Sequence, residues 1–192
     1  MNDDILKQYG TLGQDIQEIL IPTDELQRKV NQIGKQISHD YLGLNPLLVG
    51  VLKGVLFFMA DLLRSITIST EIDFIAVANY SAESREQGVV RMIKDLEIPI
   101  AGRHVLFIED VIDTGLTLNY ILQNLRARQP ASLEVCVLFN KPDHRLIEFP
   151  LKYKGFDLPD RFVVGYGLDY KERYRNLPFL GLLRPEVFRG KT

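Results

Sequence analysis

Acidic and hydroxyl-bearing side chains gather in one short stretch near the middle of this 192-residue chain. Two adjacent carboxylates, Glu109 and Asp110, are followed closely by a third, Asp113, and then by the run Thr-Gly-Leu-Thr at 114–117. Ionised carboxylates accept hydrogen bonds from sugar hydroxyls and bind Mg²⁺, while a glycine lets the backbone approach a phosphate closely. This order of residues therefore predicts a site for a sugar phosphate.

The residues on either side of this stretch predict a strand, a loop and a helix. The apolar run 105–108 is too short for a helix but typical of a buried parallel strand, which we expect to end before the carboxylates. After the loop, apolar residues recur at helical spacing: Leu118, Ile121, Leu122 and Leu125. In open α/β sheets, ligands bind outside the carboxyl ends of the strands, and a helix N-terminus favours an anion. We therefore expect the phosphate at the start of this helix.

The stretch resembles the phosphoribosyl-pyrophosphate (PRPP) signature of type I phosphoribosyltransferases. An apolar strand, Glu-Asp, two apolar residues, Asp-Thr-Gly and a final Thr all match in order. Three further segments resemble the hypoxanthine-guanine members of that family, in the same order along the chain: Leu52-Lys53-Gly54, Lys141, and Phe162 to Arg175. The resemblance covers nearly the whole chain and implies an enzyme of purine salvage.

The resemblance implies a role for each matching residue. Asp113 is the expected catalytic base, which takes the proton from N7 of the purine. The expected ligands of the ribose and 5′-phosphate of PRPP are Glu109, Asp110, Asp113, Thr114, Gly115, Leu116 and Thr117. Pyrophosphate is expected at Lys53, Gly54 and Arg175, where the peptide before the lysine can be cis in the family. The purine is expected at Lys141, Phe162, Val163 and Asp169, with Phe162 stacked on its ring and Lys141 at its 6-oxygen.

The resemblance also implies a cofactor, a reaction and a lid. Mg²⁺ is the implied cofactor, with Glu109, Asp110 and Asp169 as its expected ligands. The implied reaction transfers the phosphoribosyl group of PRPP to hypoxanthine or guanine, giving IMP or GMP and pyrophosphate. The polar segment 79–88 is expected to be a mobile lid that contains Tyr80. The family commonly has Ser-Tyr near the start of this lid, so Asn79 leaves the role of its position open.

The remaining pattern predicts a single α/β domain, residues 1–192, with a mostly parallel central sheet flanked by helices. Further strands are expected at 16–21, 47–52, 71–77 and 133–139, and helices at 23–41 and 55–63. Residues 1–13 are expected to be loose, 151–159 irregular and 162–167 strand-like. In the family, the N- and C-terminal segments build a small hood.

The composition argues against several other classes of function. A net charge of −2 is unlike that of a general nucleic-acid binder, and no apolar run reaches transmembrane length. We therefore expect no nucleic-acid or membrane partner and a cytoplasmic location. The resemblance implies a homo-oligomer, either a dimer or a tetramer. Two alternatives stay open: a phosphoribosyltransferase for another base such as xanthine, and a PRPP-sensing regulator on the same fold that binds nucleic acid.

Overall fold

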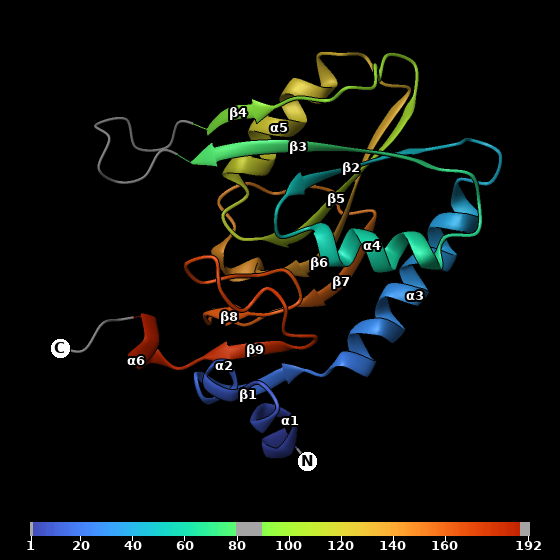
Figure 1. Cartoon of the computed structure of the whole chain (residues 1–192). Coiled ribbons are helices and arrows are strands. Elements are labelled where there is room, and N and C mark those ends of the chain that lie inside the picture. Colours follow the sequence, from blue (N-terminus) through green and yellow to red (C-terminus); the bar gives the residue numbers. More distant parts are fainter. Residues whose placement is uncertain (1, 80–89, 189–192) are drawn as a thin grey trace.

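Two sheets organise the molecule, which we describe from a computed structural model covering residues 2–79 and 90–188. The strands of the larger sheet are β2 (Leu47–Leu52), β3 (Glu71–Asn79), β4 (Val90–Lys94), β5 (His104–Ile112), β6 (Ser132–Asn140) and β7 (Tyr153–Asp157). Those of the smaller sheet are β1 (Ile16–Ile21), β8 (Val163–Val164) and β9 (Leu180–Leu183). The six strands of the larger sheet lie in the order β4-β3-β2-β5-β6-β7 (Figure 1).

All neighbouring strands of the larger sheet are parallel except β3 and β4, which are antiparallel. This arrangement confirms the predicted α/β class with a mostly parallel sheet. Because β2, β5 and β6 run in the same direction, their carboxyl ends meet at one edge of the sheet. The segments that follow these three strands are those for which the sequence predicts a binding site.

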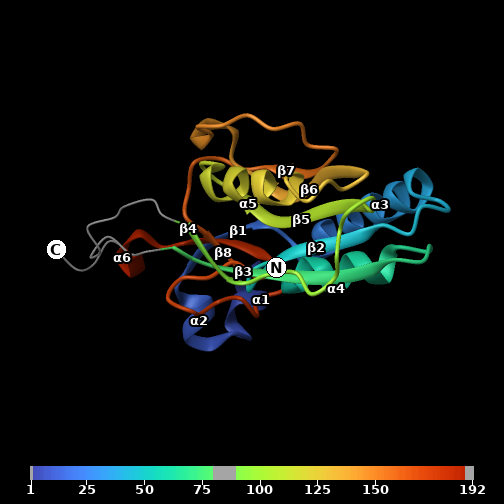
Figure 2. The ribbon, with the colours of Figure 1, turned by 90° about the horizontal axis from the view of Figure 1, so that it is seen from above.

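Helices cover both faces of the larger sheet. They are α3 (Thr23–Asp40) and α4 (Leu56–Ser65) on one face and α5 (Leu116–Arg126) on the other (Figure 2). Successive strand residues point to opposite faces, so Leu48 belongs to the core under α3 and α4 while Leu47 belongs to the core under α5. Both cores consist mainly of aliphatic and aromatic side chains, and the lone cysteine, Cys136, is buried in the first of them, as expected. This double burial explains why the strands read as continuous apolar runs.

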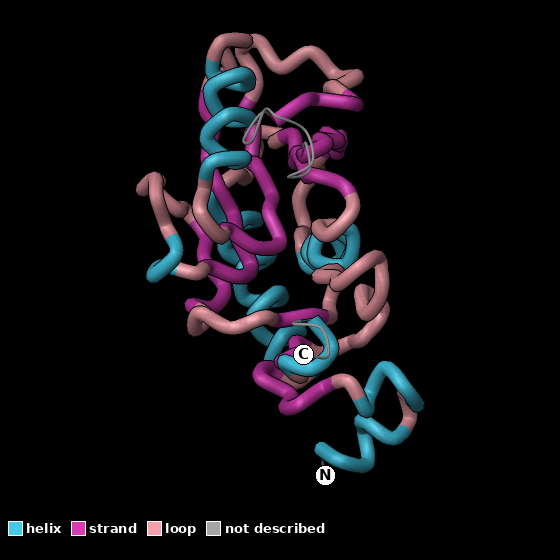
Figure 3. Tube along the Cα trace, turned by 90° about the vertical axis from the view of Figure 1, so that its left-hand side faces the viewer, coloured by secondary structure: helices cyan, strands magenta, loops and turns pink. Residues whose placement is uncertain are grey.

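The N- and C-terminal segments together form a hood, which we define as β1, β8 and β9 with the short helices α1 (Asn2–Lys7), α2 (Gly10–Gln14) and α6 (Pro185–Phe188). Strand β9 pairs antiparallel with β1 on one side and with β8 on the other. The N-terminal helices and α6 lie at the end of the molecule where the small sheet lies (Figure 3). The predicted hood is therefore present.

Three expectations about local structure are wrong. Residues 2–14 are helical rather than loose, because apolar side chains such as Leu6 and Leu12 pack on the hood core. The segment 151–159 contains β7, which pairs in parallel with β6. The strand-like run 162–167 is reduced to β8, since Gly165 and Gly167 adopt positive φ angles and turn the chain. Among the described residues, no helix is both long and apolar enough to cross a membrane.

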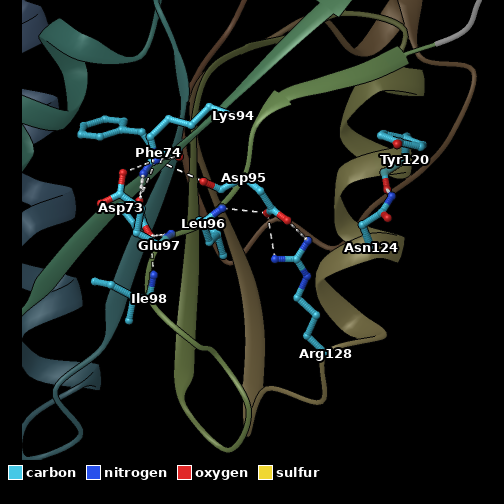
Figure 4. Close-up of polar contacts among 10 residues, drawn as sticks. All are labelled: Asp73, Phe74, Lys94, Asp95, Leu96, Glu97, Ile98, Tyr120, Asn124 and Arg128. Atoms are coloured by element: carbon cyan, nitrogen blue, oxygen red, sulfur yellow. Dashed lines mark hydrogen bonds and ion pairs between the residues drawn. The ribbon is translucent and has the colours of Figure 1, made fainter.

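The buried carboxylate of Asp73 accepts hydrogen bonds from the segment that connects β4 to β5 (Figure 4). Asp73 is only 7% exposed, and its carboxylate accepts hydrogen bonds of 2.7–2.9 Å from the backbone N–H groups of Phe74, Glu97 and Ile98. Lys94 lies 3.4 Å away. Burial raises the pKa of Asp73, but these hydrogen bonds and the lysine outweigh burial and lower the pKa below its ordinary value. The ionised carboxylate therefore stabilises the fold.

Candidate functional site

The acidic stretch lies at the carboxyl end of β5, in the middle of the larger sheet. The strand continues to Ile112 instead of ending before the carboxylates, because Val111 and Ile112 still pair with β6. Glu109 and Asp110 therefore belong to the last part of the strand, which corrects the predicted boundary. Rigid strand backbone thus positions both side chains.

Burial dominates the electrostatics of this acidic pair. It raises the pKa of Glu109 well above its usual range, and the neighbouring charge of Asp110 raises it further. Burial likewise raises the pKa of Asp110 to about 6, against the lowering effect of the Val111 N–H, which donates to Asp110 Oδ1 at 2.7 Å. Glu109 Oε2 is buried without a hydrogen-bond partner among the described residues. A buried carboxylate oxygen of this kind calls for a donor or a cation from a ligand.

The loop after β5 leads into α5 through a left-handed turn. Gly115, the N-cap of α5, has a φ angle of +82°, and a Cβ at this position would lie 2.8 Å from the Phe149 ring. The Thr114 hydroxyl accepts a hydrogen bond from the Leu116 N–H at 3.4 Å. A hollow of about 300 Å³ is lined by residues 109–115, Thr117 and Leu118 together with Val51, Leu52 and Val77. The first turn of α5 therefore faces a space that can take a phosphate.

A second hollow of about 410 Å³ lies beside the first and shares part of its lining. It is lined by Lys53, Gly54, Asp110, Val111, Asp113, Lys141, Phe162, Val163, Leu168, Asp169 and Arg175. The residues expected at pyrophosphate and purine thus come together with the acidic stretch, although they are spread over more than a hundred positions of the chain.

The segment after β2 packs closely against the acidic stretch. The Leu52–Lys53 peptide bond is cis, the conformation that the resemblance implies as possible. A Cβ on Gly54 would overlap the Asp110 carboxylate, and a Cβ on Gly167 would overlap the carbonyl of Gly54. Glycine at position 54 therefore lets the segment after β2 pack against β5, and glycine at position 167 lets the loop between β8 and β9 pack against that segment.

Ion pairs connect the cations of the second hollow to acidic residues of the loop between β8 and β9. Arg175 Nη2 lies 2.7 Å from Asp169 Oδ1 and 3.3 Å from a Glu172 oxygen. Lys53 Nζ lies 2.9 Å from the other Glu172 oxygen. The hydrogen bond from Lys53 is the main cause of a lowered pKa of Glu172. Two of the three expected pyrophosphate ligands, Lys53 and Arg175, thus converge on one carboxylate, which shows that this place suits an anion.

The side chains expected at the purine come from the end of β6 and from the segment around β8, and they line the second hollow together. Lys141 directly follows β6, and its N–H donates to the carbonyl of Ile112 at 3.0 Å. Phe162 is 39% exposed, a large fraction for a phenylalanine, and its ring stacks on Phe188 of α6 at 4.8 Å between centroids. Val163 is buried in β8. An exposed aromatic face beside a lysine suits a planar, polar ring.

Several residues at the site carry no assigned role in the sequence analysis. Glu172 bridges Lys53 and Arg175, and Phe188 stacks on Phe162. His144 contacts both Asp113 and Asp160. Nothing in the local pattern distinguishes these residues from surface positions. The predicted lid at 79–88 falls largely outside the described residues, and Tyr80 is among those not described; Asn79 is the last residue of β3.

The chain resembles characterised proteins over nearly its whole length. Residues 22–171 match the model of the phosphoribosyl transferase domain. The chain is 45% identical over 174 residues to the hypoxanthine-guanine phosphoribosyltransferase of Bacillus subtilis, covering 91% of this chain and 97% of that protein. It is 46% identical over 178 residues to the bifunctional protein TilS/HprT of Listeria monocytogenes, covering 93% of this chain but only 28% of the length of that relative.

A solved structure shows the same likeness in three dimensions. The crystal structure of a hypoxanthine phosphoribosyltransferase from Staphylococcus aureus superposes with a TM-score of 0.88 at 42% sequence identity. The superposition covers 93% of this chain and 97% of that one. The likeness therefore includes the larger sheet, the hood and the strand ends between them.

Proposed function

The chain belongs to the phosphoribosyl transferase domain family, and from this premise we propose that it is a hypoxanthine-guanine phosphoribosyltransferase. The reaction joins N9 of a 6-oxopurine to C1 of the ribose of PRPP, while the bond from C1 to the pyrophosphate oxygen breaks. The products are a nucleoside 5′-monophosphate, IMP or GMP, and pyrophosphate.

One observation carries this proposal most directly. The second hollow brings a carboxylate, Asp113, together with Lys141 and the exposed ring of Phe162. Lysine offers only hydrogen-bond donors and so suits a 6-oxygen, and the phenylalanine ring suits the face of a purine. Asp113, between the sugar and the base, accepts the N7 proton as the glycosidic bond forms.

Ribose and its 5′-phosphate occupy the first hollow. Positive charge develops on the ribose ring as pyrophosphate leaves, and carboxylates nearby stabilise that charge. Glu109 and Asp110 accept hydrogen bonds from the ribose hydroxyls, which supplies a partner for the buried Glu109 Oε2. The N–H groups at the start of α5 bind the 5′-phosphate, helped by the hydroxyls of Thr114 and Thr117.

Pyrophosphate binds between Lys53 and Arg175. Both side chains already contact the carboxylate of Glu172, so the phosphate oxygens replace that carboxylate as their partner. The planar guanidinium of Arg175 suits two phosphate oxygens at once. Gly54 brings backbone close to the same place.

The acidic residues of the site also fit Mg²⁺. Among the described residues, no three His, Cys, Asp or Glu side chains form a complete metal cage. Mg²⁺ commonly uses one or two carboxylates with substrate oxygens and water instead, and the buried Glu109 with Asp110 fits that pattern. Glu109 and Asp110 would hold one ion and Asp169 a second, with substrate oxygens and water as further ligands, and bound Mg²⁺ would neutralise charge on the pyrophosphate.

A direct assay tests the proposal. Purified protein with PRPP and Mg²⁺ should release pyrophosphate and form nucleotide with hypoxanthine or guanine. Comparing kcat/KM for hypoxanthine, guanine and xanthine identifies the preferred base, and adenine serves as the negative control. Absence of nucleotide with all three 6-oxopurines would contradict the proposed function.

A further inference from the structure

His144 connects two carboxylates at the edge of the purine site. It ends the short helix η1 (Pro142–His144), which directly follows Lys141. Its Nδ1 lies 2.8 Å from Asp113 Oδ1, and its Nε2 lies 2.7 Å from Asp160 Oδ1. All three side chains line one hollow of about 500 Å³ that Phe162 and Lys141 also line. The contact therefore lies within reach of the purine.

The chemistry of this contact defines the charge of the imidazole. An ionised carboxylate only accepts hydrogen bonds, so a ring that binds one carboxylate at each nitrogen must carry two protons. The hydrogen bond to Asp160 first, and that to Asp113 second, raise the pKa of His144 above its ordinary value of 6.5. The double contact is therefore complete at low pH, and one of its two hydrogen bonds is lost as the pH rises through the raised pKa.

Other charges surround this histidine. Arg161 and Lys141 line the same hollow and oppose a second positive charge there. Asp143 precedes His144 in η1 and favours the charge. Asp113 and Asp160 are the two groups in direct contact with the ring, so they dominate its ionisation.

We propose that His144 is a positioning residue for Asp113 and that Asp160 holds the imidazolium in place for this task. The proposal rests on the proposed function, because it assigns Asp113 as the base. Hydrogen bonding at Oδ1 restricts rotation of the carboxylate and leaves Oδ2 to accept the purine proton. A base that is oriented by a third group in this way needs no reorganisation when the substrate arrives.

Two substitutions of His144 separate positioning from folding. His144→Ala should lower kcat by roughly 10- to 100-fold, the range that one charged hydrogen bond supports, with unchanged affinity for PRPP. His144→Gln restores a hydrogen-bond donor that does not titrate, so it should recover part of kcat. The kcat of the wild type should decline as the pH rises through the pKa of His144, and this decline should be absent in His144→Gln. His39→Gln is the matched control, because the exposed His39 contacts a carboxylate, Asp40, away from the site.

Asp160→Asn tests the other half of the contact. It removes one negative charge that stabilises the imidazolium of His144, so the decline of kcat at high pH should begin at a lower pH. NMR titration of the His144 ring reports the same change without catalysis: its pKa should lie above 6.5 in the wild type and fall in Asp160→Asn.

Each result decides one part of the proposal. An unaltered kcat and pH profile in His144→Ala would overturn the positioning role, as would a His144 pKa at or below 6.5. If His144→Ala does not fold, the NMR titration and the profile of Asp160→Asn decide in its place. A wild-type chain without transferase activity would overturn the proposed function and the positioning role together, whereas the titration would still decide whether the carboxylate contact exists.

Discussion

At the residue scale, the candidate site contains three kinds of side chain, and each has a different proposed role. In the proposed function, the buried carboxylates on β5 bind the sugar, the exposed Asp113 accepts the proton, and the two lysines donate hydrogen bonds to oxygen atoms of the pyrophosphate and the purine. The pKa of Asp110, about 6, shows how strongly burial acts on the sugar side. Asp113 is half exposed and contacts an imidazole instead. Two carboxylates three positions apart thus experience different surroundings.

Replacement of the proposed catalytic base, Asp113, should affect turnover rather than substrate binding. Asp113→Asn keeps the shape of the side chain but removes its ability to accept a proton. We expect kcat to fall by roughly 10²–10⁴-fold, while the Kd of PRPP changes little. Steady-state kinetics with calorimetry of PRPP measures both. Asp24→Asn, at an exposed acid on α3, is the control, and turnover near that of wild type in Asp113→Asn would exclude the base role.

Selection of the purine substrate should depend on Lys141. Its ammonium group donates to the 6-oxygen of hypoxanthine but faces an amino group in adenine, so the lysine loses its partner. Sites built around such a hydrogen bond reject the wrong ligand by about 10⁴-fold, which we expect for kcat/KM of hypoxanthine over adenine. Lys141→Ala should weaken 6-oxopurine use far more than PRPP binding. Lys35→Ala, exposed on α3, is the control; equal use of both bases by the wild type would disprove the assignment.

At the element scale, strand ends and helix starts determine where the ligand groups lie. Strand β5 supplies the acids before it ends, and α5 begins four residues after the strand, at Leu116. The turn between them needs a positive φ at Gly115. The connection from β4 into β5 depends in turn on the hydrogen bonds of Asp73. The junction before α5 and the junction between β4 and β5 each lead to a testable prediction.

The turn before α5 should be sensitive to a single methyl group. Gly115→Ala places a Cβ 2.8 Å from the Phe149 ring at a φ of +82°, so the N–H groups of the loop should shift. The affinities for PRPP and for IMP should fall together, as measured by calorimetry. Gly43→Ala is the matched control, because its φ is +80° and its Cβ meets no atom within 4 Å. Unchanged affinity for both ligands would mean that the phosphate binds elsewhere.

The buried Asp73 should make stability depend on pH. Its pKa is lowered in the folded chain, so its contribution is present above the ordinary value of 3.8 and is lost as the pH falls through the folded pKa. Asp73→Asn should lower the free energy of unfolding at pH 7 by roughly 1–3 kcal/mol and flatten its decline toward acid. Urea unfolding at several pH values measures this. Asp24→Asn, an exposed ion pair on α3, should show neither effect.

At the scale of the whole molecule, the site lies between two separately built parts. The larger sheet contributes the segments after β2, β5 and β6, while the residue before β8 and the loop between β8 and β9 contribute Phe162, Asp169 and Arg175. The hood itself joins the two ends of the chain through the pairing of β1 with β9. A ligand that contacts both parts should therefore stabilise the complete fold.

Binding of PRPP with Mg²⁺ should accordingly raise the melting temperature. At a free concentration of 100 times its Kd, a ligand specific to the folded state adds about 2.7 kcal/mol to the free energy of unfolding. Differential scanning calorimetry measures the shift. Asp113→Asn should keep most of the shift, since it leaves the other expected PRPP ligands in place, whereas Gly115→Ala should lose most of it. A wild-type chain without a shift would contradict the proposed PRPP site.

The sequence alone determined the elements whose signals are local. The strands at 16–21 and 47–52 have the predicted bounds, since apolar residues dominate both segments and turn residues follow. The signature from 105 to 118 likewise contains its own strand, turn and helix start. Each of these signals requires only neighbours in the chain, so periodicity and residue type suffice to recognise it.

Tertiary structure alone decided the features that depend on distant partners. Strand β7 has few strand-forming residues and exists because β6 offers it hydrogen bonds. Pairing with the same strand extends β5 past its carboxylates, and hood packing folds residues 2–14. His144 meets Asp113 across 31 positions of the chain. Contacts of this kind leave no period in the sequence, because the energy that fixes them is supplied only when separate elements pack together.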